Sequence, residues 1–423
     1  MYPNPQDAVP LPPHPDLEQY RKRAKELVRA GRAGGDAIRA WAAEWVETLL
    51  SLHPDLPEFA RRDAERRIGQ VTDFARERLA SDPSLSQAQF VIARAHGFAS
   101  WPKLVHHLEG LTAADAGLSA YERAVEAIVR GDLATLQRLL AERPTLVRER
   151  STRDHDSTLL HYTSANGVES YRQKTPPNIV AIARTLLDAG AEVDAEAAVY
   201  GRGATTLALT VTSSHPRDAG LQIPLADLLL ERGARIDPDI VRYCLVNGCP
   251  EAAAHMATRG APVGVEGAAG TGRVDLLRPH FEPERNVSQA DGAEALVMAA
   301  WYDQREAVAY LLDQGVDPGA RRPHDGNTAL HVASYSGYPA LVELLLARGA
   351  PVDVNDAVYG TPPVVWALHA WLAERRSNAD DYKAVLRLLA NAGAAVRREW
   401  IDDERIRADG ALYAALARRI VAG

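Results

Sequence analysis

Two short stretches of the chain hold the residue types of a metal or acid–base site. HDSTLLH at 155–161 and HDGNTALH at 324–331 each place a His-Asp pair shortly before a second histidine. Imidazole and carboxylate groups ligate zinc and exchange protons near neutral pH. The chain has no HExxH, CxxC or GxSxG sequence, so we predict no metal site. A nucleophilic triad stays open, because its members need not be neighbours in sequence.

Two glycine-rich stretches approach phosphate-binding motifs but miss their essential residues. GAAGTGRV at 267–274 has Arg273 and Val274 where a phosphate loop requires lysine and a magnesium-binding hydroxyl. YGRGATT at 200–206 lacks the third glycine of a dinucleotide motif, and no strand is expected before it. We therefore predict no nucleotide and no other cofactor.

The densest mixture of hydrogen-bond donors and acceptors lies in NGVESYRQKTPPN at 166–178 and TSSHPRDAGLQ at 212–222. Arginine binds carboxylates through paired hydrogen bonds, so these stretches could form a ledge for an anionic ligand. The favoured alternative is that they brace neighbouring helices, since insertions in surface loops cost little. For the ligand interpretation, the candidate catalytic residues are His161, Glu169, Tyr171 and His215, and the candidate ligand contacts are Arg172, Lys174, Tyr200 and Arg202.

Composition and charge narrow the class of protein. The net charge is −8, and residues 1–112 are neutral, so the rest of the chain carries the whole excess. An acidic body argues against nucleic acid and anionic membranes as partners. The two cysteines, Cys244 and Cys249, form no disulfide framework, and the uncharged stretches are shorter than the ~20 apolar residues that cross a bilayer. The N-terminal stretch has no apolar core typical of a signal peptide. We expect a soluble, cytoplasmic protein.

These motifs lie on an array of helical repeats. In the clearest unit, DGNTALHVASYSGYPALVELLLARGAPVDV at 325–354, Thr328 suits a helix N-cap, and Gly337 and Gly349 suit helix ends. Apolar residues recur between them at helical spacing. Weaker copies begin near residues 124, 240, 265 and 294. Each helix pair has one apolar stripe that only a neighbouring pair can bury, which predicts an all-α solenoid.

The recurring letters identify a family. TALH at 328–331, TLLH at 158–161 and LLxxGA at 186–191, 229–234 and 345–350 resemble the ankyrin repeat. The resemblance covers about eight units between residues 119 and 400, and the string from 153 to 281 is similar to bacterial ankyrin-repeat proteins. It implies that His161 and His331 make backbone hydrogen bonds between repeats. His155 and His324 would then lie at the hairpin fingertips.

The flanks of the array differ from it. Residues 15–112 read as four or five amphipathic helices, which we interpret as a helical domain that caps the first repeat. Residues 1–14 are expected to be a disordered tail, and 401–423 a C-terminal capping helix. Three repeats are longer than the template, with insertions at 166–178, 212–222 and 370–381. All three insertions fall between the first and second helix of a repeat.

Aromatic residues recur at the first-helix positions that face the concave side of an ankyrin array. Small residues (Gly267, Gly270 and Thr271) occupy these positions in the fifth repeat, which predicts a glycine-floored pocket. Aromatic side chains are enriched at binding hot spots, although some of these rings could pack between repeats instead. The candidate groove residues are Tyr162, Tyr243, Met298, Trp301, Tyr302, Tyr335, Trp366 and His369.

We therefore predict that the concave face recognises another protein or peptide, and that no catalysis is required. The alternative is an enzyme or small-molecule binder that uses the loops of the second and third repeats. A third interpretation is an adaptor in which only the N-terminal helices contact a partner.

Overall fold

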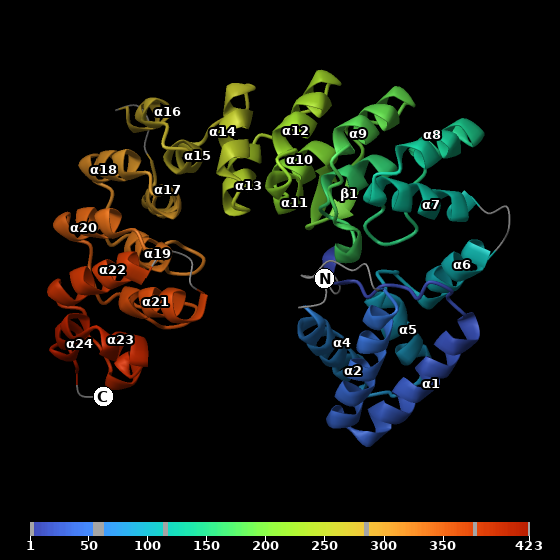
Figure 1. Cartoon of the computed structure of the whole chain (residues 1–423), viewed down its shortest axis with the longest axis horizontal. Coiled ribbons are helices and arrows are strands. Elements are labelled where there is room, and N and C mark those ends of the chain that lie inside the picture. Colours follow the sequence, from blue (N-terminus) through green and yellow to red (C-terminus); the bar gives the residue numbers. More distant parts are fainter. Residues whose placement is uncertain (1–3, 54–62, 113–116, 283–286, 375–378, 422–423) are drawn as a thin grey trace. The chain divides into compact units, whose positions relative to one another are not determined.

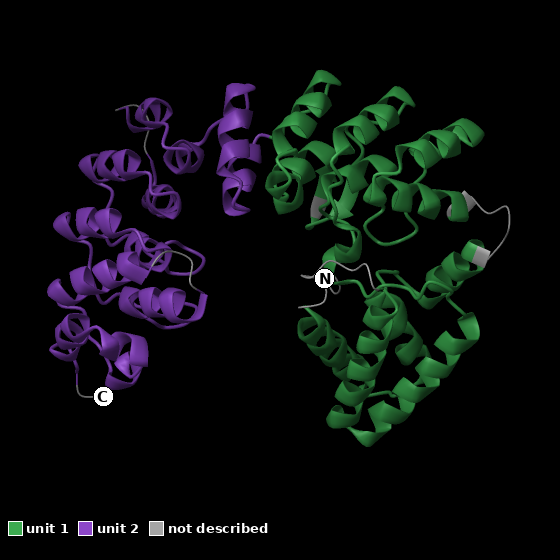
Figure 2. Cartoon of the chain, viewed as in Figure 1, with its two compact units in different colours: residues 1–237 green, residues 238–423 purple. Residues whose placement is uncertain are grey.

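The computed structural model describes residues 4–53, 63–112, 117–282, 287–374 and 379–421. The chain divides into two compact units, residues 1–237 (unit 1) and 238–423 (unit 2), shown in Figure 2. Among the described residues, the regular secondary structure is helical except for one short hairpin and two isolated bridges. The all-α solenoid predicted from the sequence is confirmed.

Unit 1 begins with a bundle of helices and continues into three repeats (Figure 1). The bundle has its own core, whose buried residues run from Val9 to Leu108. The predicted boundary near residue 112 thus follows this core, but it lies inside unit 1. The elements of unit 1 are η1 (Pro5–Asp7), α1 (Leu17–Ala33), α2 (Gly35–Ser51), α4 (Ala64–Leu79), α5 (Leu85–Ala95), α6 (Trp101–Thr112), α7 (Gly117–Arg130), α8 (Leu133–Glu142), η2 (Pro144–Arg148), η3 (Leu159–Ser164), η4 (Ser170–Arg172), α9 (Ile179–Asp188), β1 (Glu196–Val199), β2 (Arg202–Thr205), α10 (Thr206–Val211), α11 (Ser214–Asp218) and α12 (Gln222–Glu231).

Unit 2 consists of five helix pairs and a C-terminal segment. The first helices α15, α17, α19 and α21 pack in sequence against one another, and the second helices form a separate layer (Figure 1). The elements of unit 2 are α13 (Ile240–Val246), α14 (Pro250–Thr258), α15 (Val265–Gly270), α16 (Val274–Leu277), η5 (Arg278–Phe281), α17 (Gln289–Trp301), α18 (Arg305–Asp313), α19 (Ala329–Ser336), α20 (Pro339–Ala347), α21 (Pro363–His369), η6 (Ala370–Glu374, a π-helix), α22 (Ala379–Asn391), η7 (Arg398–Ile401), α23 (Glu404–Ala408) and α24 (Gly410–Ala417).

The seventh repeat shows how the local sequence sets these pairs. Thr328 caps α19 by accepting a hydrogen bond from the backbone N–H of His331, whose Nδ1 accepts in return from the N–H of Thr328 at 3.2 Å. The Nε2 of His331 lies 3.1 Å from the backbone oxygen of Thr361 in the next repeat. Gly337 (φ 69°) and Gly349 (φ 85°) take the left-handed conformation that ends each helix. The inter-repeat role implied for His331 is therefore present.

The structure corrects two expectations about local order. Residues 4–14, expected to be disordered, include η1, and Ala8 and Val9 are buried; residues 1–3 lie outside the described residues. A strand does precede YGRGATT, because β1 and β2 pair antiparallel as a hairpin. Tyr200 (φ 55°) and Gly201 (φ 75°) form its two-residue turn, and a tight hairpin of this type requires left-handed residues. The stretch is therefore a hairpin tip and no dinucleotide motif.

The three insertions lie where the sequence places them, between the first and second helix of their repeats. The first contains η4, the second contains α11, and the third contains η6. Residues 375–378 of the third insertion lie outside the described residues. Beyond the second repeat, Gly272 (φ 70°) ends α15, as expected for a helix-turn residue in GAAGTGRV.

Candidate functional site

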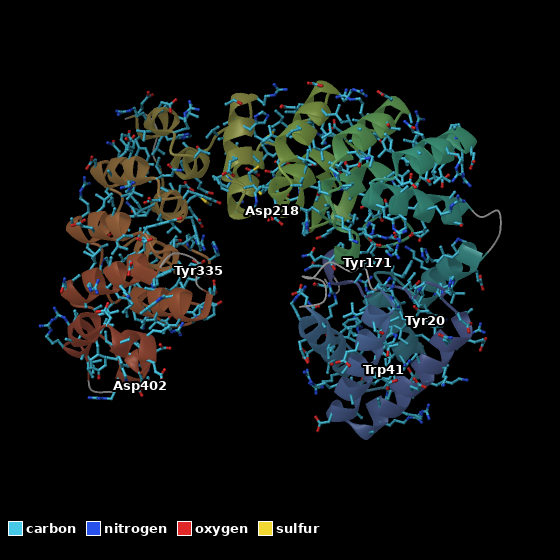
Figure 3. All side chains as sticks on the ribbon, viewed as in Figure 1. Tyr20, Trp41, Tyr171, Asp218, Tyr335 and Asp402 are labelled. Atoms are coloured by element: carbon cyan, nitrogen blue, oxygen red, sulfur yellow. The ribbon has the colours of Figure 1, made fainter. Side chains whose placement is uncertain are left out.

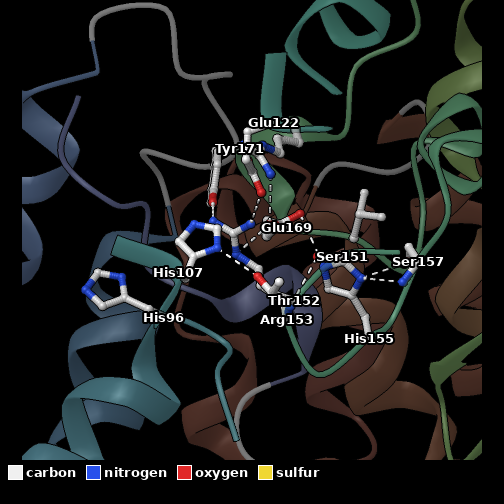
Figure 4. Close-up of polar contacts among 12 residues, drawn as sticks. His96, His107, Glu122, Ser151, Thr152, Arg153, His155, Ser157, Glu169 and Tyr171 are labelled. Atoms are coloured by element: carbon white, nitrogen blue, oxygen red, sulfur yellow. Dashed lines mark hydrogen bonds and ion pairs between the residues drawn. The ribbon is translucent and has the colours of Figure 1, made fainter. Parts of the chain in front are cut away.

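The insertion of the second repeat carries charged side chains into the interior of unit 1. The Nε of Arg153 lies 2.8 Å from Glu169 Oε1, and its Nη1 lies 3.2 Å from Glu122 Oε1. The Nη1 of Arg172 lies 3.2 Å from Glu169 Oε1, and its Nη2 pairs with Glu122 Oε2. Glu122, Arg153, Glu169 and Arg172 thus close a ring of alternating charge (Figure 4), which we call the buried ion cluster.

The buried ion cluster gathers groups from distant parts of unit 1. Glu122 comes from α7, Arg153 from the fingertip of the first repeat, and Glu169 and Arg172 from the insertion. Tyr171 stacks against His53 at a ring distance of 6.4 Å. These contacts join the N-terminal helices to the first two repeats.

Two further hydrogen bonds surround the cluster. The Nη2 of Arg67, on α4, donates to Ser170 Oγ at 2.6 Å. The Nδ1 of His107, on α6, lies 2.8 Å from Thr152 Oγ1 (Figure 4). The insertion and the fingertip segment that carries Arg153 are therefore each bonded to the N-terminal helices.

Burial and charge act against each other in the cluster. Burial alone would raise the pKa of Glu122, but Arg172 and Arg153 overcome it and lower that pKa to about 2. The same two arginines hold the pKa of Glu169 well below its usual range. Burial also lowers the pKa of His107 to about 3, so this imidazole is neutral. Both carboxylates are ionised at neutral pH, and their charge is compensated inside the protein.

One part of the cluster has the connectivity of a nucleophilic triad. His155 Nδ1 lies 2.9 Å from Ser157 Oγ, and His155 Nε2 lies 3.6 Å from Glu169 Oε2. However, Ser157 and Glu169 have no exposed surface. The cavity beside His155 and Glu169 measures about 20 Å³, which is room for roughly one water. Ser157 and Glu169 are therefore closed to a substrate, although His155 also lines a larger hollow of about 770 Å³.

The two insertion loops touch each other, as their positions in neighbouring repeats predict. Asn166 Nδ2 donates to Thr212 Oγ1 at 3.2 Å. Ser213 Oγ donates to the backbone oxygen of Ala165 at 3.3 Å. Tyr200, at the hairpin tip, donates to Asn166 Oδ1 at 2.7 Å. These contacts favour the bracing interpretation of the loops over the ledge for an anionic ligand.

The other loop candidates do not assemble into one site. His161 is fully buried, its Nδ1 accepts from the N–H of Thr158 at 3.0 Å, and burial lowers its pKa to about 4. Lys174 and His215 are half-buried, and the ion pairs of the cluster are made without them. The side chain of Arg202 lies outside the described residues. Only Glu169, Tyr171 and Arg172 of the predicted set come together.

Unit 2 carries aromatic side chains along its layer of first helices. The ring centroids of Trp301 and Tyr335 are 5.9 Å apart, and those of Tyr335 and Trp366 are 5.6 Å apart, both edge to face. Figure 3 labels Tyr335 on this layer. All three rings are partly exposed, and Trp301 and Tyr335 pack on the core of unit 2. We call Trp301, Tyr335 and Trp366 the aromatic ladder.

Hydrogen bonds hold the ladder in place. Trp366 Nε1 donates to Asp356 Oδ2 at 3.2 Å and to Thr361 Oγ1 at 3.1 Å. Tyr335 donates its hydroxyl hydrogen to Glu374 Oε2 at 2.6 Å. Because the polar ends of these rings are satisfied within the chain, their apolar faces are presented at fixed positions.

A hollow of about 850 Å³ lies at the Trp301 end of the ladder. Its wall includes the predicted residues Met298, Trp301 and Tyr302 and several charged residues that the groove prediction missed. Tyr302 donates to the backbone oxygen of Leu245, which fixes one side of the wall. The residues that line the hollow are Arg242, Leu245, Val246, Gly248, Glu266, Glu294, Met298, Trp301, Tyr302, Arg322, His324, Ser336 and Tyr338.

Three groove expectations need correction. Tyr162 is fully buried beside Arg172 and His155, so it presents no surface to a partner. The glycine-floored pocket is also wrong, because a Cβ at Gly270 would lie 2.7 Å from Leu245 Cδ1 and from a side-chain carbon of Met298. These side chains already fill the space above Gly270. Met298 is itself buried, although it lines the hollow.

The remaining groove candidates lie at the edges of this face. Tyr243 is half-buried on α13, where its hydroxyl donates to Asp239 Oδ2 at 3.4 Å. His369 is exposed at the end of α21, with its Nε2 3.3 Å from Glu374 Oε1. Both are accessible, and neither lines the hollow.

The repeats that carry this face match a known protein family. The model of ankyrin repeats in three copies matches residues 266–356, which include Trp301 and Tyr335 of the ladder and most residues that line the hollow. Residues 266–356 of the chain are thus ankyrin repeats.

The curated relatives match only in part. Protein PhlB of Serratia liquefaciens is 33% identical over 106 residues, 24% of this chain and 46% of PhlB. Serine/threonine-protein kinase 12 of Arabidopsis thaliana is 36% identical over 101 residues, 22% of each chain. The ANK repeat-containing protein nipk-1 of Caenorhabditis elegans is 31% identical over 113 residues, 26% of this chain and 18% of nipk-1. The chain thus spans less than half the length of these relatives.

The described residues were compared with the requirements of a membrane-spanning helix and of a metal site, and they meet neither. Within the ranges given above, no helix is long and apolar enough to cross a membrane. Among the same residues, no three His, Cys, Asp or Glu side chains are grouped as metal ligands would be.

Proposed function

We propose that unit 2 recognises a segment of another protein along its layer of first helices. Ankyrin repeats are in general protein-interaction modules. The observation that carries the proposal for this chain is the aromatic ladder, whose partly exposed rings are fixed edge to face beside the hollow. Rigid aromatic side chains give a large contact area at little entropic cost.

The proposal favours an extended or helical peptide segment over a small molecule. The ladder spans three successive repeats, and a ligand of that length has to contact several rings at once. The small-molecule or enzyme alternative in unit 1 has less support, because Glu169 and Arg172 already pair within the buried ion cluster.

Selection of peptides from a displayed library on the full chain tests the proposal. We expect binders whose affinity falls about tenfold or more in Trp301→Ala, since central aromatic anchors dominate such interfaces. Tyr310→Ala on α18 is a matched control, because Tyr310 is a half-buried aromatic residue in the layer of second helices. Equal loss in both variants, or no binders at all, contradicts the proposal.

A further inference from the structure

We propose that the hollow of unit 2 receives a positively charged side chain, the guanidinium or ammonium group of an arginine or lysine in the bound segment. This inference rests on the proposed function, because it names the chemistry of the partner at the same face. It concerns Glu266, Glu294 and Trp301, which line one continuous hollow.

The cationic residues of the hollow are already paired. Arg242 Nε lies 2.9 Å from Glu266 Oε2. Arg322 Nε donates to Asp325 Oδ1 at 3.0 Å, and its Nη2 pairs with the second oxygen. The nearest cationic candidate to Glu294 is His324, whose Nδ1 lies 3.4 Å from Glu294 Oε1 and which carries charge only when protonated. Among the described residues, the carboxylate of Glu294 therefore has no ion pair with an arginine or a lysine.

Both carboxylates are largely withdrawn from water. The side chain of Glu266 is 21% exposed and that of Glu294 is 19% exposed. Burial raises the pKa of Glu266, and Glu294 and Asp291 raise it further, while Arg242 opposes them. The direction of this shift therefore reflects first the withdrawal of this carboxylate from water.

The apolar part of the wall suits the stem and the head of a basic side chain. Val246, an exposed apolar residue of the wall, offers surface to a chain of methylene groups. Trp301 offers a ring face, which attracts a cation more strongly than other aromatic side chains do. An acidic or apolar residue at the same place would leave Glu266 and Glu294 desolvated beside it without added positive charge. Charge complementarity therefore selects a basic residue.

The test compares peptides selected on the wild-type chain with those selected on Glu294→Gln, a substitution that removes the charge and keeps the shape. We expect the wild-type binders to share a lysine or arginine. Replacing that residue by glutamine should weaken binding about tenfold, and Glu294→Gln should remove the preference. Glu306→Gln is the matched control, because Glu306 is exposed on α18 of the same repeat. Thermal unfolding of each variant confirms that it is folded.

The outcomes separate this inference from the proposed function. Binders that depend on Trp301 but share no basic residue, and that ignore Glu294→Gln, overturn the cation site and leave the proposed function standing. An absence of binders overturns both. Binders whose shared lysine or arginine depends on Glu294 and not on Glu306 support both.

Discussion

The buried ion cluster of unit 1 and the aromatic ladder of unit 2 are both built from residues that protein interfaces favour. In unit 1, the arginines and glutamates satisfy one another away from solvent. In unit 2, the polar ends of Tyr335 and Trp366 are satisfied, but the ring faces and the carboxylate of Glu294 remain available. Interface-type composition therefore marks a binding site only where the groups are left incompletely paired.

The two repeats that carry a His-Asp pair at their fingertips show the same difference at one position. His155 is 3% exposed and contacts Ser157 and Glu169, because the inserted loop folds over it. The side chain of His324 is 63% exposed and lines the hollow. The insertion thus converts a surface position into an interior one.

Removing one member of the buried ion cluster should have the largest effect on stability. Glu169→Ala leaves Arg153 and Arg172 buried with only part of their counter-charge, and breaking such a pair costs about 3–5 kcal/mol. Urea unfolding followed by circular dichroism measures the change in the free energy of unfolding. Glu192→Ala, at an exposed glutamate of the same repeat, should stay within about 0.5 kcal/mol. Equal effects of the two substitutions would show that the ring does not hold the repeats together.

Acid should lower the stability of unit 1 more than that of unit 2. The folded-state pKa of Glu122, about 2, lies below the ordinary value of 4.5. Its contribution is therefore present above pH 4.5 and is lost as the pH falls towards 2, about 3 kcal/mol in all. Burial also lowers the pKa of His96 to about 4. Because the unfolded chain then binds a proton more readily than the folded one, stability falls from pH 6.5 downward.

Glu266 behaves in the opposite sense. Its pKa is raised by burial, so the folded state binds a proton more readily, and acid relieves unfavourable charge around Glu266. In the same unit, burial lowers the pKa of His331, which partly offsets this effect. We expect hydrogen exchange, resolved by peptide and corrected for intrinsic rates, to show protection lost first in unit 1 as the pH falls from 6.5 to 4. Protection lost first around Glu266 would contradict the assigned direction of charge compensation.

Removing the hydrogen bond that orients the ladder should have a smaller effect. Trp366→Phe keeps an aromatic ring but loses the donor to Asp356 and Thr361. We expect a loss of about 1 kcal/mol, typical of one net hydrogen bond, measured by thermal unfolding. Trp400→Phe, at a half-buried tryptophan near the C-terminal helices, serves as the control. If Trp366→Phe weakens peptide binding as well, orientation of the ring contributes to recognition.

The sequence predicted the repeat architecture because helix periodicity, caps and left-handed glycines are local signals. Leu330, Thr328 and Gly349 identify their repeat without knowledge of any other residue. The same logic places the insertions, since each lengthens a known interval. It does not reveal what an insertion contacts.

The cluster and the hollow depend on distant partners, and this is why the sequence missed Glu122 and Arg153 in the cluster and most of the wall of the hollow. Glu122 and Arg153 meet Glu169 only after the insertion folds back on α7. Glu266 and Glu294 did carry a signal, because each precedes a groove position, Gly270 or Met298, by four residues and so shares its helix face. Tyr162 failed as a groove residue because the insertion covers it.

The hydroxyl of Tyr200 should have the smallest effect among these groups. It bonds Asn166 Oδ1 at 2.7 Å and Gln6 Oε1 at 3.2 Å, yet Tyr200 is 52% exposed. Water can replace both partners, so Tyr200→Phe should cost about 0.5 kcal/mol or less, as measured by urea unfolding. A loss of unfolding free energy near that of Glu169→Ala would show that the hairpin tip and the N-terminal segment stabilise the repeats as strongly as the ion cluster does. A small loss would show that the stabilising contacts are those of the buried ion cluster, where no water competes for the charges.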